Sequence, residues 1–325
     1  MPATETLPVV FEDVRRAADR IRPFVKRTQV MRSRSFDAQA GVAAFFKCEN
    51  LQTGGAFKIR GASNFIFSIP YADLPRGVVA YSSGNHAQAV AIAARAAGTK
   101  ATLVMPADAP RSKMEATRAQ GAEIVIYDRF RDDRAAIAAR IAQETGATVV
   151  PPFDHPWIIA GQGTTALEML EEVPDMDTLV APIGGGGLMS GCSIAVKGVQ
   201  RDIRVIGVEP EAGDDTRRSL EAGERVRIPV PRTIADGQQA DIPGELTFAV
   251  NRQVVDTIVT VSDAEILDAM AFLFDRMKLV TEPSGASAAA ALLAGRAEAG
   301  GARVGVVISG GNVGAARFAE LMAGR

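Results

Sequence analysis

One lysine stands in a setting that suits covalent chemistry. Lys58 follows the glycines Gly54 and Gly55 and the aromatic Phe57, and it opens a helical stretch. A lysine amine with a lowered pKa attacks carbonyl carbons to form an imine, and Phe57 can pack against a flat ring beside it. An arbitrary lysine is usually an exposed surface group. The glycine turn and the aromatic neighbour therefore carry the prediction that Lys58 is a nucleophile.

A second polar segment stands where an expected strand ends and an expected helix begins. It consists of Ser82, Ser83, Gly84, Asn85 and His86. Ligands of open parallel sheets bind at the carboxyl ends of strands, and a helix N-terminus offers free N–H groups with partial positive charge. A carboxylate would suit this segment, although a Ser/Asn helix cap also explains the residue types.

Four consecutive glycines, Gly184–Gly187, precede Leu188 in another strand-to-helix turn. Such a run is unfavourable in regular structure, and a need for bare N–H groups around an anion explains it. We expect a phosphate. The run does not match the dinucleotide fingerprint, because Met189 stands where a glycine is required. Ser309, before two further glycines, ends the last expected strand and offers one hydrogen bond at the cleft floor.

An acidic loop follows another expected strand, from Glu209 to Asp215. Carboxylate and carbonyl oxygens are the ligands that Mg²⁺ and Ca²⁺ prefer. The alternative is a solvated acidic loop without a cation.

Strands and helices alternate between residues 77 and 151. The expected strands are residues 78–81, 101–105, 123–127 and 147–150. The expected helices between them are residues 85–97, 111–119 and 131–144. Strands separated by such helices form a parallel sheet with right-handed crossovers. The pattern predicts one compact lobe.

A second alternating series surrounds the first along the chain. Its expected strands are residues 43–48, 178–182, 204–208 and 304–309. Its expected helices are residues 163–172, 263–278 and 285–294, with another after the glycine run. We expect residues 211–254 to be irregular. The predicted division is a large domain, residues 1–76 and 152–325, with a small domain, residues 77–151, inserted into it.

The composition fits a small-molecule enzyme better than a nucleic-acid or membrane protein. The chain has 325 residues, enough for two lobes, and a formal net charge of -2. No targeting pattern opens the sequence and no apolar run is long enough to cross a bilayer, so we expect a cytoplasmic protein. Cys48 and Cys192 have no metal-type spacing, and we expect both to be packing residues.

Together the segments around Lys58, Asn85, the glycine run and Ser309 resemble the fold type II family of pyridoxal-phosphate enzymes. The resemblance extends over nearly the whole chain and is strongest with the branch of threonine/serine dehydratases, serine racemases and L-threo-3-hydroxyaspartate ammonia-lyases. It implies an α/β fold like that of the tryptophan synthase β chain, with two lobes, each a mainly parallel sheet flanked by helices. The large domain would bind the cofactor pyridoxal 5′-phosphate.

The resemblance also implies residue roles. Lys58 would hold the cofactor as a Schiff base, with Phe57 against its ring, Asn85 as a donor to its phenolic oxygen and Ser309 as the partner of its pyridine nitrogen. The phosphate cradle would consist of Gly184, Gly185, Gly186, Gly187 and Leu188. The substrate carboxylate would bind to Ser82, Ser83, Gly84, Asn85 and His86. Ser83, opposite Lys58, would be a second proton carrier that permits racemisation.

The acidic loop matches family members that bind a divalent cation. The matching positions are Glu209, the backbone carbonyl of Gly213, and Asp215, so the resemblance implies Mg²⁺ or a similar cation and, as in most members, a homodimer. The sequence departs from the family pattern at Ala56, where many members have serine. Phe153 stands where animal racemases tend to have asparagine, which resembles the dehydratases instead.

The implied function is loss of water and then ammonia from a small L-hydroxy amino acid, giving a 2-oxo acid. L-Threonine, L-serine and L-threo-3-hydroxyaspartate are the candidate substrates. The alternatives are a serine or aspartate racemase with dehydratase side activity, a ligand sensor without turnover and, more distantly, a nicotinamide-dependent oxidoreductase. The dianionic hydroxyaspartate requires an extra cation in the cleft, for which His155 and Arg60 are candidates.

Overall fold

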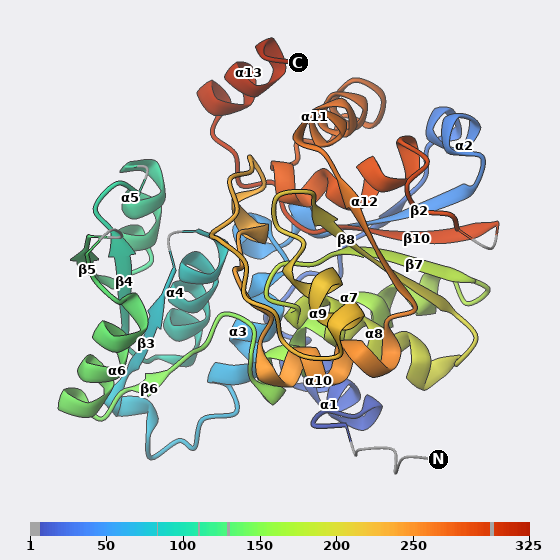
Figure 1. The fold of residues 1–325 in the computed structure, drawn as a ribbon. Helices are drawn as coiled ribbons and strands as arrows, with labels where there is room; N and C mark the ends of the chain where they lie inside the picture. Colours follow the sequence, from blue (N-terminus) through green and yellow to red (C-terminus); the bar gives the residue numbers. More distant parts are fainter. Residues whose placement is uncertain (1–6, 83, 110, 129–130, 300–301) are drawn as a thin grey trace.

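The strands of the protein form two sheets that lie side by side (Figure 1). The computed structural model describes residues 7–82, 84–109, 111–128, 131–299 and 302–325. The strand order is β1-β2-β10-β7-β8-β9 in the larger sheet and β5-β4-β3-β6 in the smaller. The short β1 is antiparallel to β2, and the other neighbouring strands are parallel. The family fold expected from the sequence is confirmed in this respect.

The strands are short and mostly apolar. The larger sheet contains β1 (Val30–Met31), β2 (Ala43–Cys48), β7 (Thr178–Pro182), β8 (Arg204–Pro210), β9 (Thr257–Val261) and β10 (Arg303–Ile308). The smaller sheet contains β3 (Val78–Tyr81), β4 (Ala101–Pro106), β5 (Glu123–Tyr127) and β6 (Thr148–Val149). Continuous burial, as along all of β7, is typical of parallel sheets with helices on both faces.

Helices cover both faces of the larger sheet (Figure 1). One face packs against α1 (Phe11–Ile21), α7 (Pro156–Glu172), α8 (Gly187–Val199) and α10 (Glu245–Val254). The other packs against α2 (Arg34–Ala40), α11 (Asp263–Phe272) and α12 (Pro283–Leu293), and α13 (Ala315–Ala323) contacts α11. The smaller sheet has α4 (Asn85–Ala97), α5 (Arg111–Ala119) and α6 (Arg134–Thr145). The helix α3 (Lys58–Ile66) packs against both α7 and α4, and so joins the two parts.

Several expectations about the elements were wrong. Residues 211–254, expected to be irregular, contain α9 (Asp215–Ala222), the 3₁₀ turn η4 (Asp236–Gln238) and α10. The helix expected at 163–172 begins at Pro156, where the His155 side chain caps it. Gly161 and Gly163 are poor helix formers in isolation, but they allow close packing here: a Cβ on Gly163 would lie 2.6 Å from the Gly191 carbonyl oxygen. The helix expected at 263–278 ends as a π-helical turn, η5 (Leu273–Met277). The strand β9 was not predicted.

Two further expectations concern burial. Cys48 and Cys192 are free and fully buried, as expected of packing residues. No helix among the described residues has the length and apolar character needed to cross a bilayer. The domain boundaries at residues 76 and 152 stay a prediction, although β3 to β6 form a sheet of their own.

Candidate active site

Strands of both sheets end at one cavity of about 550 Å³, a size typical of small-molecule sites. Ser82 follows β3, Tyr127 ends β5, Pro182 ends β7 and Ser309 follows β10, and all four line it. The predicted cofactor and substrate residues that also line it are Phe57, Lys58, Gly84, Asn85, His86, Gly184, Gly185, Gly186, Gly187 and Leu188. Ser83 lies outside the described residues. The structure therefore brings together the described residues of the four segments.

The amine of Lys58 enters this cavity from the first residue of α3. Its Nζ donates a hydrogen bond to the Pro152 carbonyl oxygen at 2.7 Å and lies 5.2 Å from the centre of the Phe57 ring. Burial lowers the pKa of Lys58 to about 8, because a charged amine loses hydration there. A pKa of about 8 gives Lys58 a far larger neutral fraction near neutral pH than an ordinary lysine has, and the neutral amine is the form that acts as a nucleophile or base.

The turn before Lys58 depends on glycine. Gly55 has φ +71°, a conformation that L side chains rarely adopt, and a Cβ there would lie 2.2 Å from Asn312 Oδ1. The Asn312 side chain donates to the Gly54 carbonyl oxygen at 2.7 Å. The lysine is therefore held by a fixed turn rather than a flexible one.

The helix α4 presents its N-terminus to the cavity, where free backbone N–H groups suit a carboxylate. His86, in its first turn, is buried and its Nε2 lies 3.0 Å from the Val150 carbonyl oxygen. Burial, with a further contribution from the charge of Lys58, lowers the pKa of His86 to about 3. The imidazole is therefore neutral and supports the loop rather than supplying a charge.

The glycine run forms a bend that only small residues fit. Gly186 has φ +92°, and a Cβ on Gly185 would lie 2.3 Å from the Phe153 ring. Thr247 of α10 donates its hydroxyl to the Gly185 carbonyl oxygen at 2.8 Å. This leaves bare N–H groups at the start of α8, an arrangement that fits the phosphate of pyridoxal phosphate.

Ser309 and Asn85 sit in hydrogen-bond networks that the sequence did not reveal. The Ser309 hydroxyl donates to the Ser284 carbonyl oxygen at 3.4 Å. Asn85 Nδ2 donates to Glu282 Oε1 at 2.6 Å, and Asn85 Oδ1 accepts from Asn312 at 2.9 Å. Proline at the first helical position is a helix-start signal, so Pro283 marks the start of α12, and Glu282 beside it could have been considered on that basis.

The acidic loop forms a separate group beside α9. Glu209 is buried and accepts hydrogen bonds from the Thr216 and Arg217 backbone N–H groups at 3.0 and 2.9 Å. Burial, reinforced by the charge of Asp215, raises the pKa of Glu209 to about 8, and burial raises the pKa of Asp215 to about 7. Both carboxylate oxygens of Asp215 are buried without a hydrogen-bond partner in the described structure.

Unpartnered carboxylate oxygens fit a divalent cation, which would hold both acids in their charged form. The described residues contain no cluster of three or more His, Cys, Asp or Glu side chains suited to a metal. The predicted set of two carboxylates and the Gly213 carbonyl needs no third side chain of these types.

The prediction that Arg60 or His155 binds a second substrate carboxylate was wrong, because neither side chain lines the cavity. Arg60 is fully buried and bound to Glu49 and Glu168. His155 caps α7 through the Trp157 N–H and packs against the Phe65 ring. Arg134, at the start of α6, instead lines the cavity, and among the described lining residues it is the single arginine.

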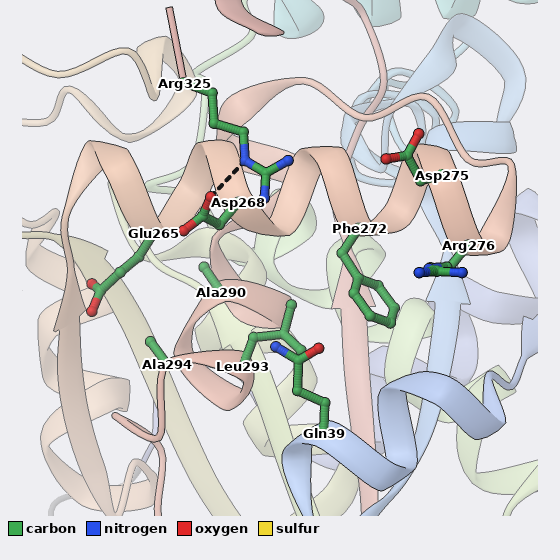
Figure 2. A pocket seen from close by; sticks show the side chains of 10 residues that line it. All are labelled: Gln39, Glu265, Asp268, Phe272, Asp275, Arg276, Ala290, Leu293, Ala294 and Arg325. Atoms are coloured by element: carbon green, nitrogen blue, oxygen red, sulfur yellow. Dashed lines mark hydrogen bonds and ion pairs between the residues drawn. The ribbon is translucent and has the colours of Figure 1, made fainter.

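A second hollow, of about 340 Å³, lies over α11 and α12 and shares no lining residue with the first (Figure 2). Its charged groups include partners of one another, such as Arg325 and Asp268. It contains none of the predicted site residues.

The Lys58 amine, the glycine bend and Ser309 line one cavity where two mainly parallel sheets adjoin. This arrangement is that of a pyridoxal-phosphate enzyme of fold type II. The family model described as "Pyridoxal-phosphate dependent enzyme" matches residues 21–310, and the chain belongs to this family. Membership in this family excludes the alternative of a nicotinamide-dependent oxidoreductase.

Its relatives include ammonia-lyases and racemases. An L-threo-3-hydroxyaspartate ammonia-lyase of Pseudomonas sp. is 46% identical, covering 97% of this chain and 98% of the relative. A serine racemase of Schizosaccharomyces pombe is 44% identical, covering 96% and 97%. The structure of maize serine racemase has a TM-score of 0.93 at 42% identity, covering 97% of each chain.

Proposed function

We propose that the protein removes water and then ammonia from a small L-hydroxy amino acid, with L-threo-3-hydroxyaspartate as the preferred substrate. The observation that carries the elimination is the Lys58 amine, whose pKa is about 8, in one cavity with the glycine bend and Ser309. The relatives named as ammonia-lyases support the same reaction.

Pyridoxal phosphate, when bound, supplies the electron sink that makes bond cleavage at the substrate α-carbon possible. Lys58, as a neutral amine, accepts the α-proton. The N-terminus of α4 holds the α-carboxylate. Ser309 offers a neutral hydroxyl rather than a carboxylate, so it does not hold a ring nitrogen protonated, which favours elimination over transamination.

The preference for hydroxyaspartate rests on Arg134. Its guanidinium is 5.8 Å from the centre of the Tyr81 ring on the cavity wall. Asp132, Asp133 and Asp241 also line the cavity, so a second substrate carboxylate needs a cation there. Asp133 is engaged as the cap of α6, and Asp241 is paired with Arg227, which leaves Arg134 for the substrate.

The test compares ammonia release from L-threo-3-hydroxyaspartate, L-serine and L-threonine by the holoenzyme and by Arg134→Met. Loss of a hydrogen bond to a charged group costs about 1.5–3 kcal/mol, so kcat/KM for hydroxyaspartate should fall roughly 10- to 150-fold, with little change for serine. Arg131→Met, three residues earlier and outside the cavity lining, is the control. An equal loss for serine would remove the proposed role of Arg134.

The racemase alternative rests on the relatives named serine racemase and on Ser83 as second proton carrier. We propose racemisation as a side activity, which chiral chromatography of residual substrate measures. Ser83→Ala should abolish it and spare ammonia release. A D-product formed faster than ammonia would make racemisation the main activity.

We also propose that Glu209, the Gly213 carbonyl and Asp215 bind Mg²⁺, and that the protein is a cytoplasmic homodimer. The unpartnered oxygens of Asp215 support the cation site. Light scattering of the holoenzyme tests the dimer.

A further inference from the structure

Gln238 lies between the glycine bend and the acidic loop. It is 2% exposed and ends η4. A Cβ on Gly184 would lie 2.8 Å from the Gly237 carbonyl oxygen and 3.2 Å from the Gln238 Cα, so this turn packs directly against the bend. On its other side, a Cβ on Gly213 would lie 3.2 Å from the Gln238 carbonyl oxygen.

The Gln238 side chain bonds to the residue preceding each site. Its Nε2 donates to the Ile183 carbonyl oxygen at 2.8 Å and to the Val208 carbonyl oxygen at 2.9 Å. Ile183 immediately precedes Gly184, and Val208 immediately precedes Glu209. The two strands also pair directly here, because the Ile183 N–H donates to the Val208 carbonyl oxygen at 2.8 Å. The Gln238 amide adds a side-chain link between the two carbonyl oxygens where the two sites begin.

The amide orientation is fixed, because a flipped side chain would place Oε1 against two carbonyl oxygens. In this orientation Oε1 is buried and has no hydrogen-bond partner among the described atoms. An unpaired buried acceptor costs about 1–3 kcal/mol.

We propose that Gln238 is a positioning residue that couples the cation site to the phosphate-binding bend. Cation binding fixes the Glu209 loop, the Val208 carbonyl transmits this to the Gln238 amide, and the amide holds the Ile183 carbonyl and the bend after it. The inference rests on the proposed Mg²⁺ site, and it assigns no chemical step to Gln238.

The coupling is measured as a ratio of two dissociation constants. Pyridoxal phosphate is titrated into cofactor-free protein, with absorbance as readout, in EDTA and in saturating Mg²⁺. Couplings between sites are commonly about 5- to 150-fold, so Mg²⁺ should tighten cofactor binding at least about fivefold. Linkage requires the cofactor to tighten Mg²⁺ binding by the same factor, which gives a second measurement on the unmodified protein.

The variant Gln238→Met keeps the side-chain length and removes the amide. Its ratio should fall towards one, with only the direct Ile183–Val208 backbone bond left between the strands. Mg²⁺ should still raise its melting temperature because the carboxylates are untouched. Gln52→Met is the matched control: Gln52 is equally buried, but its amide bonds to the Lys26 backbone instead, and its ratio should match the unmodified protein.

The possible results distinguish failure of the coupling from failure of the cation site. An unchanged ratio in Gln238→Met overturns the inference. A ratio of one in the unmodified protein, with Mg²⁺ still raising the melting temperature, also overturns it and leaves the cation site intact. If Mg²⁺ changes neither quantity, the cation site fails and the coupling fails with it. If Gln238→Met does not fold, a ratio of one in the reciprocal measurement on the unmodified protein still overturns the inference.

Discussion

Two groups of buried charge lie in the part of the protein built on the larger sheet, and they are balanced differently. The Arg60 cluster consists of Lys47, Glu49, Arg60 and Glu168, two cations and two anions. Arg60 contacts both oxygens of Glu49 and both oxygens of Glu168, at 2.8–2.9 Å, and Lys47 contacts Glu168 at 2.7 Å. The acidic pair, Glu209 and Asp215, has only backbone N–H donors on Glu209 and no partner on Asp215.

The pKa shifts follow this difference. Burial alone would lower the pKa of Arg60, but the carboxylates of Glu49 and Glu168 raise it well above its ordinary value. Burial raises the pKa of both acids in the acidic pair. The Arg60 cluster is balanced by its own charges, whereas the acidic pair has no cation among the described residues, and this difference is the basis of the proposed Mg²⁺ site.

The largest expected effect comes from breaking the balanced cluster. Arg60→Met leaves two buried carboxylates facing one lysine, and removing one partner of a buried pair costs about 3–5 kcal/mol. Urea unfolding measures the loss. Arg27→Met, which breaks an exposed pair with Glu171, should change stability by less than about 1 kcal/mol. Equal small losses in both variants would contradict the structural role of the cluster.

The next largest effect on stability is expected from binding Mg²⁺ to the acidic pair. Mg²⁺ at 100 times its dissociation constant should stabilise the folded protein by about 2.7 kcal/mol if it binds only the folded state. Asp215→Asn should lose this response, as measured by melting in EDTA and in Mg²⁺. Asp214→Asn is the control, because Asp214 is already paired with Arg217 and Arg218. A response that survives in Asp215→Asn would place the cation elsewhere.

Lys58, like the acidic pair, is a buried ionisable group whose hydrogen bond does not go to an opposite charge. Its amine donates to the uncharged Pro152 carbonyl oxygen. Its pKa is lowered from 10.5 to about 8. The burial penalty on the charged amine is therefore present below about pH 8 and is relieved as pH rises towards 10.5. Proton abstraction requires the neutral amine, so kcat should fall about tenfold per pH unit below pH 8.

A steady-state profile from pH 6 to 9.5 tests this, with protein stability monitored in parallel. His86, with a pKa of about 3, does not titrate in this range. Glu209 and Asp215, with pKa values of about 8 and 7, do, so the profile is measured in saturating Mg²⁺. A flat kcat from pH 6.5 to 9 would show that proton transfer to Lys58 does not limit turnover.

The sequence predicted the local parts of this architecture well. The smaller sheet follows from alternating apolar runs and alanine-rich helices, and the strand and helix bounds of β3, α4, α5 and β5 match those expected. Lys58 and the glycine run, which line the same cavity, were singled out because their neighbours in the sequence are unusual. Local propensity was misleading at α7, where Gly161 and Gly163 serve helix packing.

Residues that act through distant partners could not be found in the same way. Gln238 bonds to Ile183 and Val208, which lie 55 and 30 positions away in the sequence. Arg60 bonds to Glu168, which lies 108 positions away. Nothing local distinguished Arg60 from Arg134 as the cation that lines the cavity. Only the tertiary structure shows that one is neutralised and the other lies at the cavity wall.

The smallest expected effect concerns an exposed pair at the hollow over α11 and α12. Arg325 contacts Asp268 at 2.7 Å (Figure 2), and their side chains are 49% and 62% exposed. Such pairs contribute about 0.2–1 kcal/mol and are screened by salt, so Asp268→Asn should lower stability by less than about 1 kcal/mol in dilute buffer and by almost nothing at 1 M NaCl. Urea unfolding at both salt concentrations measures this. A loss of stability as large as that of Arg60→Met would contradict the role given to burial. It would mean that the balance of charge alone sets how much an ion pair contributes to the stability of the fold.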